Sequence, residues 1–316
     1  MDTAGSGKIR ARKRNVFYRF QLAIKKHWVL YLMFMPMLAF FLVFRYAPMG
    51  GLVIAFQNYR PALGIRESPF VGLQHFRDFF GSIFFMRVLR NTFLLSFWEL
   101  VFRFPAAIIF ALLLNELVSK RLKKAVQTVT YMPHFISVVV AVGITVLFVE
   151  RTGIINDIRA VFGLDRIVFL NYYRYFRPIF VTSVIWQGLG WSSIIYIAAL
   201  AGVSTELYDA ALVDGAGRFR KIWHVSLPGI MPTISIMLIL AIGGMLSVGA
   251  ERVMLLYNPG IYETADVIQT FVFRRGIEDG RHGFAAAVGM FNSVINFVLL
   301  LSADRISKML GQRGLF

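Results

Sequence analysis

Long apolar runs separated by polar stretches extend along almost the whole chain. A helix needs roughly 20 residues, within a range of about 17–25, to cross the hydrocarbon core of a bilayer. Six runs reach this length, and they predict membrane spans at residues 28–44, 91–114, 128–149, 178–200, 229–250 and 284–302. The apolar residues do not alternate with polar ones, so a membrane β-barrel does not fit the pattern. The predicted fold class is an all-α integral membrane protein with six transmembrane helices.

Composition agrees with this pattern. Hydrophobic residues make up 57% of the 316 residues and charged residues 16%, which is more apolar than a soluble domain of this size requires. The chain has no Cys, which excludes disulfides and thiolate metal sites. Its net charge of +17 suits anionic lipid headgroups better than nucleic acid. We therefore expect membrane lipid, and no nucleic acid, among the partners.

Basic residues near the ends of the spans predict the orientation. Residues 1–27 contain eight Lys and Arg, and the apolar run at 28–44 is longer than a signal-peptide core and is followed by no Ala-x-Ala cleavage site. Residues 1–27 are therefore expected to form a basic cytoplasmic segment. Six spans over residues 28–302 then return the tail, residues 303–316, to the cytoplasm. The later Lys residues agree, because all of them before the tail fall in loops that this topology makes cytoplasmic: Lys120, Lys123, Lys124 and Lys221. The expected location is a bacterial inner membrane.

Arginine is less asymmetric than lysine. Many Arg residues fall in the predicted outer loops: Arg45, Arg60, Arg66, Arg77, Arg87, Arg90, Arg151, Arg159, Arg166, Arg174, Arg177, Arg252, Arg274, Arg275 and Arg281. One interpretation is ordinary solvated loops with headgroup contacts. The other is an outer face whose electrostatic field favours an anionic solute.

The loop at residues 203–228 is patterned in a way that most loops between spans are not. Ser204 is placed to cap a helix, and Gly215 and Gly217 interrupt the helical pattern further on. Apolar residues recur at helical spacing at Ala211, Leu212, Ala216, Phe219, Trp223 and Leu227. Pro228 then suits the first turn of the next span. Two short amphipathic helices are predicted, and by amphipathicity alone they would lie in the headgroup region.

The order of residues in this loop resembles the hallmark loop of ABC importer permeases. The matching positions are Asp209, Ala210, Ala211, Asp214, Gly215, Ala216 and Phe219, followed by Leu227 and Pro228. In that family the loop begins Glu-Ala-Ala and its helix docks on a cytoplasmic ATPase. Asp209 is one methylene shorter than the usual Glu. The resemblance therefore implies a type I importer permease fold, with this loop as an ATPase-coupling helix.

Further blocks resemble the branch of this family that imports oligosaccharides and polysaccharide fragments, including alginate-type importers. They are GLVIAFQNYRP (51–61), NTF (91–93), LLLNEL (112–117), YMPHFIS (131–137), LLYNPGIYETADVIQTFVFRRG (255–276) and AAVGMFNSVINF (286–297). The resemblance implies a second permease subunit, two ATP-binding subunits and an extracytoplasmic solute-binding protein. ATP and Mg would be bound by the partner ATPases, and this chain would hold no cofactor.

The chain itself is not expected to be an enzyme. Its GSGK stretch at residues 5–8 is no phosphate-binding loop, because Asp2 and Ile9 occupy the positions that need Gly and Ser or Thr. Five scattered His residues suggest no metal site. A membrane-embedded glycan enzyme would need clustered carboxylates, and the outer acids are dispersed. A permease for another solute, such as a peptide, remains an alternative.

Polar side chains at mid-span depth are candidates for the solute pathway, because polar groups inside a membrane tend to face a cavity or the bundle. The candidates are Trp186, Gln187, Trp191, Ser193, Gly243, Asn292, Ser293 and Asn296. Helix packing through small and polar residues is an equally good explanation. Glu99 and Arg103, four residues apart, are expected to form a buried pair.

The expected mechanism is alternating access. A helix at residues 207–219 would move as a rigid body with the ATPases, and the spans would rock between inward-open and outward-open states. The solute would be an oligosaccharide, and the Arg-rich outer loops suggest a uronate-type acidic one.

Overall fold

Most of the residues that the structure describes are helical. The computed structural model describes residues 25–247 and 249–309; the GSGK stretch and most of the basic N-terminal segment lie outside this range, as do the last residues of the tail. Within the described range the only β-structure is an isolated bridge between Gln57 and Phe70. The predicted all-α fold class is confirmed.

The chain divides into two compact units, residues 1–53 and 54–316. In the first unit, α2 (Trp28–Phe41) continues into a π-helical turn (Leu42–Tyr46) and then into a 3-10 helix (Ala47–Phe56) that crosses the boundary. None of the α2 residues is buried. The segment Trp28–Phe56 is long and apolar enough to span a membrane.

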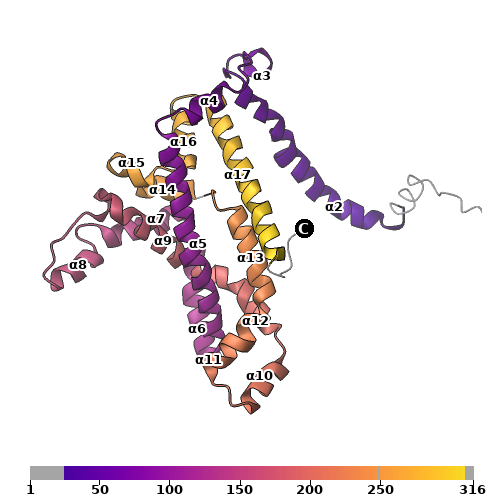
Figure 1. Cartoon of the computed structure of the whole chain (residues 1–316), viewed down its shortest axis with the longest axis vertical. Helices are drawn as coiled ribbons and strands as arrows, with labels where there is room; N and C mark the ends of the chain where they lie inside the picture. Colours follow the sequence, from indigo (N-terminus) through magenta and orange to yellow (C-terminus); the bar gives the residue numbers. More distant parts are fainter. Residues whose placement is uncertain (1–24, 248, 310–316) are drawn as a thin grey trace, which may run out of the picture. The chain divides into compact units, whose positions relative to one another are not determined.

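The second unit contains four further candidate spans and a bent fifth one (Figure 1). The four are α5 (Phe85–Asn115), the segment Val138–Val161, α9 (Tyr173–Ala201) and α17 (His282–Met309). The fifth joins Arg218–Gly229 to α13 (Met231–Gly243) with a bend of 63°. If that bent pair counts as one span, the total of six agrees with the prediction. Helix α17 also continues seven residues beyond the predicted end of the last span, into the predicted tail.

The predicted third span, 128–149, is wrong at its start. An amphipathic helix, α6 (Lys120–Tyr131), ends there, and a 3-10 turn (Met132–Phe135) follows. Pro133 lacks an amide hydrogen and favours the start of a helical segment, and the Ser137 hydroxyl then accepts a hydrogen bond from the Val140 amide as the N-cap of α7 (Val138–Val149). Because the apolar run continues across this break, hydropathy alone does not reveal it.

The predicted fifth span, 229–250, is also wrong at its end. Helix α13 ends at Gly243, and the described residues from Gly244 to Gly249 are not helical. A short helix, α14 (Ala250–Leu256), follows and packs against α7 and α9. The chain therefore turns back into the bundle where the sequence predicted the start of an outer loop.

Shorter helices complete the unit. They are α3 (Gly64–Glu67), α4 (Gln74–Phe80), α8 (Ile154–Val161), a 3-10 turn (Phe169–Asn171), α10 (Thr205–Val213), α11 (Arg218–Lys221), a π turn (Ile222–Ser226), α12 (Leu227–Gly229), a 3-10 turn (Pro259–Ile261), α15 (Tyr262–Ala265), α16 (Ile268–Phe273) and a π turn (Arg274–Glu278). In Figure 1, α10 and α11 lie at one end of this unit, and α4 and α16 lie at the opposite end.

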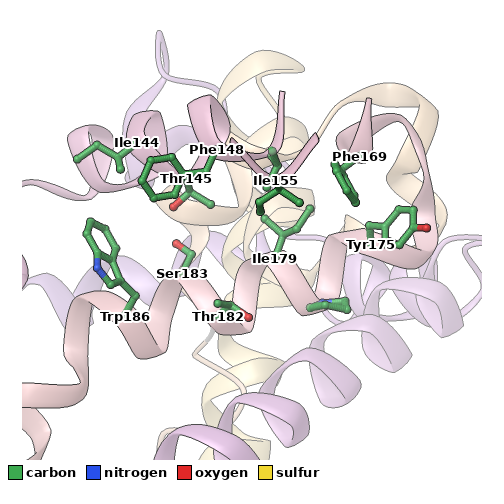
Figure 2. A pocket seen from close by; sticks show the side chains of 12 residues that line it. Ile144, Thr145, Phe148, Ile155, Phe169, Tyr175, Ile179, Thr182, Ser183 and Trp186 are labelled. Atoms are coloured by element: carbon green, nitrogen blue, oxygen red, sulfur yellow. The ribbon is translucent and has the colours of Figure 1, made fainter. Parts of the chain in front are cut away.

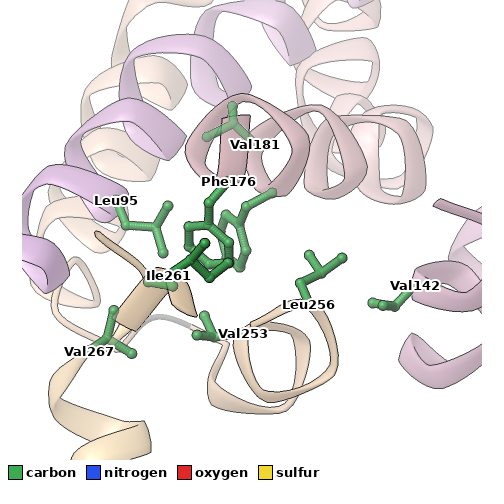
Figure 3. Packing of buried hydrophobic residues seen from close by; sticks show 10 residues of the cluster. Leu95, Val142, Phe176, Val181, Val253, Leu256, Ile261 and Val267 are labelled. Atoms are coloured by element: carbon green, nitrogen blue, oxygen red, sulfur yellow. The ribbon is translucent and has the colours of Figure 1, made fainter. Parts of the chain in front are cut away.

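The core of the second unit forms where α5 and α9 pack along their length. Leu95 of α5, Phe176 and Val181 of α9, and Val253 and Leu256 of α14 meet in one buried cluster (Figure 3). A second cluster, around Tyr196, Leu200 and Ile230, packs the α10 end of the unit. The first cluster packs α14 against α9, and the second packs Val203 and Ile222, which flank α10 and α11, at the other end of α9.

Candidate functional site

In the α10–α11 segment, a defined helix end separates α10 from α11. Ser204 caps α10, with its hydroxyl accepting from the Glu206 amide at 3.2 Å, as predicted. At the other end Gly215 has φ +72°, and the amides of Gly215 and Ala216 donate to the carbonyls of Leu212 and Ala211. This is a Schellman stop, which needs a residue in the left-handed region. The prediction of two short helices is confirmed, and the single helix at 207–219 is wrong, because α10 ends at Val213 and α11 begins at Arg218.

Large apolar side chains of this segment are exposed. Phe219 is 89% exposed and Val213 89%, and Leu212 and Trp223 are exposed as well. The same segment carries Glu206, Asp209, Asp214, Arg218, Arg220 and Lys221, which is too much charge for hydrocarbon. Apolar side chains gathered on a charged surface indicate a protein-binding face.

The segment is tied firmly to the bundle. The Tyr208 and Ser226 hydroxyls hydrogen-bond at 2.9 Å, which joins α10 to the π turn before α12, and Ser226 is buried. Where the segment joins the bundle, a Cβ added to Gly229 would lie 2.8 Å from the Val203 side chain, so the chain before α10 and the end of α12 are in close contact. The α10–α11 segment is therefore joined to α12 by a hydrogen bond and by close packing.

A polar cavity of about 500 Å³ lies between α5, the turn before α7, α9 and the segment entering α14. Its charged and polar lining consists of Glu99, Arg103, His134, Ser137, Gln187, Ser247, Glu251 and Arg252. Such a lining offers hydrogen-bond donors and acceptors to a hydroxyl-rich solute inside an otherwise apolar bundle. This cavity is the candidate solute site.

Arg252 lines the cavity, and its predicted position in an outer loop is wrong. It is 8% exposed, and its guanidinium donates hydrogen bonds to Ser183 and Gln187 of α9. Both partners are neutral. The sequence signal for a buried site is the charged pair Glu251-Arg252 in an otherwise apolar stretch. Its meaning depends on the early end of α13, which turns α14 into the bundle.

Glu99 and Arg103 form the predicted ion pair, with Arg103 Nη1 2.6 Å from Glu99 Oε1. The prediction that this pair is buried is wrong, because the Glu99 and Arg103 side chains are 22% and 41% exposed and both line the cavity. Gly188 lies beside the arginine, where an added Cβ would make an ordinary contact of 3.5 Å with Arg103 Nη2.

The aromatic and amide candidates on α9 separate onto two sides of the helix. Gln187 lines the cavity, and its amide donates to the Ile136 carbonyl at 3.0 Å. Trp191 stacks on His134 with ring centroids 4.4 Å apart, next to the cavity. Trp186 instead lines a separate apolar pocket of about 440 Å³ between α7, α8 and α9 (Figure 2).

The other five candidates have partners that match the helix-packing interpretation. The Ser193 hydroxyl donates to Gly190 O at 2.6 Å and Ser293 to Gly289 O at 3.0 Å, both within their own helices. Gly243 lets α13 approach Leu300 of α17. Asn292 and Asn296 bond the chain that leaves α13: Asn296 accepts from the Leu246 amide at 3.0 Å and donates to Ser247 at 3.1 Å, and Asn292 donates to Leu246 O at 3.4 Å.

At the α16 end, a buried carboxylate joins distant parts of the chain. Asp266 is fully buried and accepts from Arg274 at 2.7 Å and from Thr270 at 2.9 Å, with Arg87 of α5 at 3.5 Å. Burial lowers the pKa of Arg274, but the hydrogen bond and charge of Asp266 outweigh it, so this pKa is raised. Asn91 of α5 donates to the Asp266 carbonyl at 3.1 Å.

The chain is similar in sequence to known transport proteins. Residues 103–312 match the family described as "Binding-protein-dependent transport system inner membrane component". Protein LplB of Bacillus subtilis (strain 168) is 44% identical over 295 residues, covering 93% of each chain. The polygalacturonan/rhamnogalacturonan transport system permease protein YteP of the same organism is 43% identical over 288 residues, 91% of this chain and 90% of that one.

The fold also matches solved structures of a bacterial alginate ABC transporter. A chain of its crystal structure in complex with an alginate pentasaccharide-bound periplasmic protein superposes with a TM-score of 0.86 and 42% identity, covering 94% of this chain and all of that one. A second crystal structure, of a bacterial ABC transporter that imports the acidic polysaccharide alginate, gives a TM-score of 0.85 at 42% identity, over 92% of this chain and 99% of the other.

Proposed function

This chain belongs to the family of binding-protein-dependent transport system inner membrane components, and from that premise we propose that it is the translocation subunit of an importer for acidic oligosaccharides. It is a multi-pass inner-membrane permease of the sugar-importing ABC type. The proposal extends to its partners: a second permease subunit, two ATP-binding subunits that hold ATP and Mg, and a solute-binding protein on the outer side. In this proposal the chain itself contributes the conformational change, and the partner subunits hydrolyse ATP.

The single observation that carries the proposal is the α10–α11 segment. Its exposed Phe219, Val213 and Leu212 have no cover within the described chain, while its root is packed against α12. Such a segment suits docking on a soluble, cytoplasmic ATPase that pulls on it. When the ATPases close, α10 and α12 would move together, and the spans would alternate between inward-open and outward-open states.

The cavity supports the solute class. Uronate oligomers carry both hydroxyls and carboxylates, and the cavity offers Gln187, Ser247 and Ser137 for the first and Arg103 and Arg252 for the second. Glu99 and Glu251 balance the charge of the two arginines, which suits passage of an anion better than its retention. The names of YteP and of the alginate transporter refer to acidic polysaccharides, which supports an acidic solute.

The test is a reconstituted transporter, in which solute-stimulated ATP hydrolysis and uptake are measured together. Phe219→Ala should weaken ATPase docking about 10- to 100-fold, because burying a Phe side chain contributes about 1.5–3 kcal/mol. The matched control is Val161→Ala on α8, which also removes an exposed apolar side chain (84%). Uptake and ATP hydrolysis equal to wild type in Phe219→Ala, at limiting ATPase concentration, would contradict the docking assignment.

The solute class is tested separately. Uronate oligomers should stimulate hydrolysis more strongly than neutral oligomers of the same length, and added salt should reduce the difference. Equal stimulation by both would remove the acidic assignment and leave the sugar-importer assignment in place. Stimulation by peptides alone would remove both.

A further inference from the structure

A further cavity, of about 550 Å³, lies between α5 and α9 and shares no lining residue with the candidate solute site. We call it the arginine groove. Its walls include Trp98 and Phe102 from α5 and Arg174, Arg177, Val181 and Ile185 from α9. Nothing in the transport mechanism uses it.

One end of the groove is cationic. Arg174 and Arg177 lie in the first two turns of α9, and within the described chain neither forms an ion pair with a carboxylate. Arg177 donates to Asn91 Oδ1 at 3.2 Å, but its Nε is buried without a partner. Arg174 lies over the Tyr175 ring at 4.7 Å.

The remainder of the groove is apolar. Trp98 and Phe102 stack with centroids 5.5 Å apart and an interplanar angle of 17°, opposite Val181 and Ile185. Away from the arginine end, the polar side-chain groups of the lining are the Thr182 hydroxyl and the Trp98 indole N–H. An oligosaccharide here would lose hydrogen bonds to water along its length without replacing them.

The length of the groove fits half a bilayer. From Arg177 to Ile185 is eight residues of helix, or about 12 Å at 1.5 Å per residue. One leaflet of the hydrocarbon core is about 15 Å thick, half of the usual ~30 Å. The arginines therefore lie where a lipid headgroup would be when the apolar part lies along an acyl chain.

We propose that the arginine groove binds one anionic phospholipid, with its phosphate between Arg174 and Arg177 and an acyl chain along Trp98, Phe102 and Ile185. Arginine presents several donors in a fixed plane that matches phosphate oxygens. The positive charge selects anionic over zwitterionic headgroups, and the aromatic wall supplies contact area for the chain. The lipid would lie against the α5–α9 pair that also carries Glu99 and Gln187.

The experiment uses the complete importer in nanodiscs containing equal amounts of phosphatidylglycerol and phosphatidylcholine. Lipid retained after transfer to detergent is counted by native mass spectrometry. Wild type should retain phosphatidylglycerol, and the double variant Arg174→Gln/Arg177→Gln should retain about 30-fold less, since each arginine near anionic lipid is expected to contribute about fivefold. The control Arg159→Gln/Arg166→Gln removes the same charge from the region of α8 and should behave as wild type.

Two further measurements keep the proposal testable if the double variant does not assemble. Ile185→Trp should fill the apolar part and reduce retention with both arginines present. A photo-crosslinking residue in place of Thr182 should label lipid. Equal retention of the two lipids by wild type, unchanged retention in the double variant or in Ile185→Trp, or labelling of the sister permease in place of lipid would each overturn the proposal.

Discussion

The contact between α9 and α6 depends on the absence of a side chain at Gly190. A Cβ added there would lie 2.6 Å from the Thr130 carbonyl carbon and from Tyr131 Cδ1, and closer still to the Thr130 carbonyl oxygen. Because two of these atoms belong to backbone, no side-chain rotation relieves the clash, and α9 must separate from α6. That contact also positions Trp191 against His134 beside the cavity.

We expect Gly190→Ala to destabilise the protein. Overpacking of this kind costs about 1–3 kcal/mol, and occasionally more. The better helix propensity of Ala returns at most about 1 kcal/mol. The matched control lies on the same helix: a Cβ at Gly188 meets its nearest atom, Arg103 Nη2, at an ordinary 3.5 Å. Gly188→Ala should therefore be neutral or slightly stabilising.

The assay is thermal unfolding of the purified, assembled transporter, with the three proteins compared in one detergent. Gly190→Ala should lower the midpoint temperature by several degrees, and Gly188→Ala should leave it unchanged or raise it. Equal midpoints for the two variants would refute the inference that α6 and α9 are in backbone contact at Gly190.

Three more predictions concern polar side chains with partners in distant parts of the chain. Asp266→Asn should destabilise the protein by about 3–5 kcal/mol, because it leaves a partly buried arginine unpaired. The control Asp279→Asn breaks an exposed pair and should cost less than about 1 kcal/mol. Thermal unfolding measures both changes. Arg252→Lys keeps the charge but not two donors in one plane, so uptake should fall in reconstituted vesicles, and wild-type uptake would argue against the solute site. Asn296→Leu should cost about 1–3 kcal/mol, since the chain after α13 loses its hydrogen bonds, while Ser293→Ala should be nearly neutral; similar unfolding midpoints would contradict this.

Local chemistry carried much of the prediction for the α10–α11 segment. Ser204 as an N-cap and Gly215 at a helix stop follow from side-chain and backbone properties that act within four or five residues. The continuous helix at 207–219 was wrong for the same kind of reason, because the left-handed Gly215 ends α10 before Phe219 is reached.

The solute cavity was much less predictable. Gln187 was identified because a polar amide in a long apolar run is costly unless it faces a partner. Its partner Arg252 is 65 residues away, on a helix that turns into the bundle only because α13 stops at Gly243. Ser193, Gly243 and Asn296 have the same composition signal as Gln187, and only their neighbours distinguish packing from pathway.

The sequence by itself determined the all-α class, the number of spans and the position of the α10–α11 segment, because hydropathy and helix-end chemistry are local quantities. Only the tertiary structure decided where the apolar run at 128–149 breaks, that Arg252 is buried, and that Arg174 and Arg177 lie above an aromatic groove. Those features depend on which helices meet, and helix contacts join residues that are far apart in the chain and leave no local pattern.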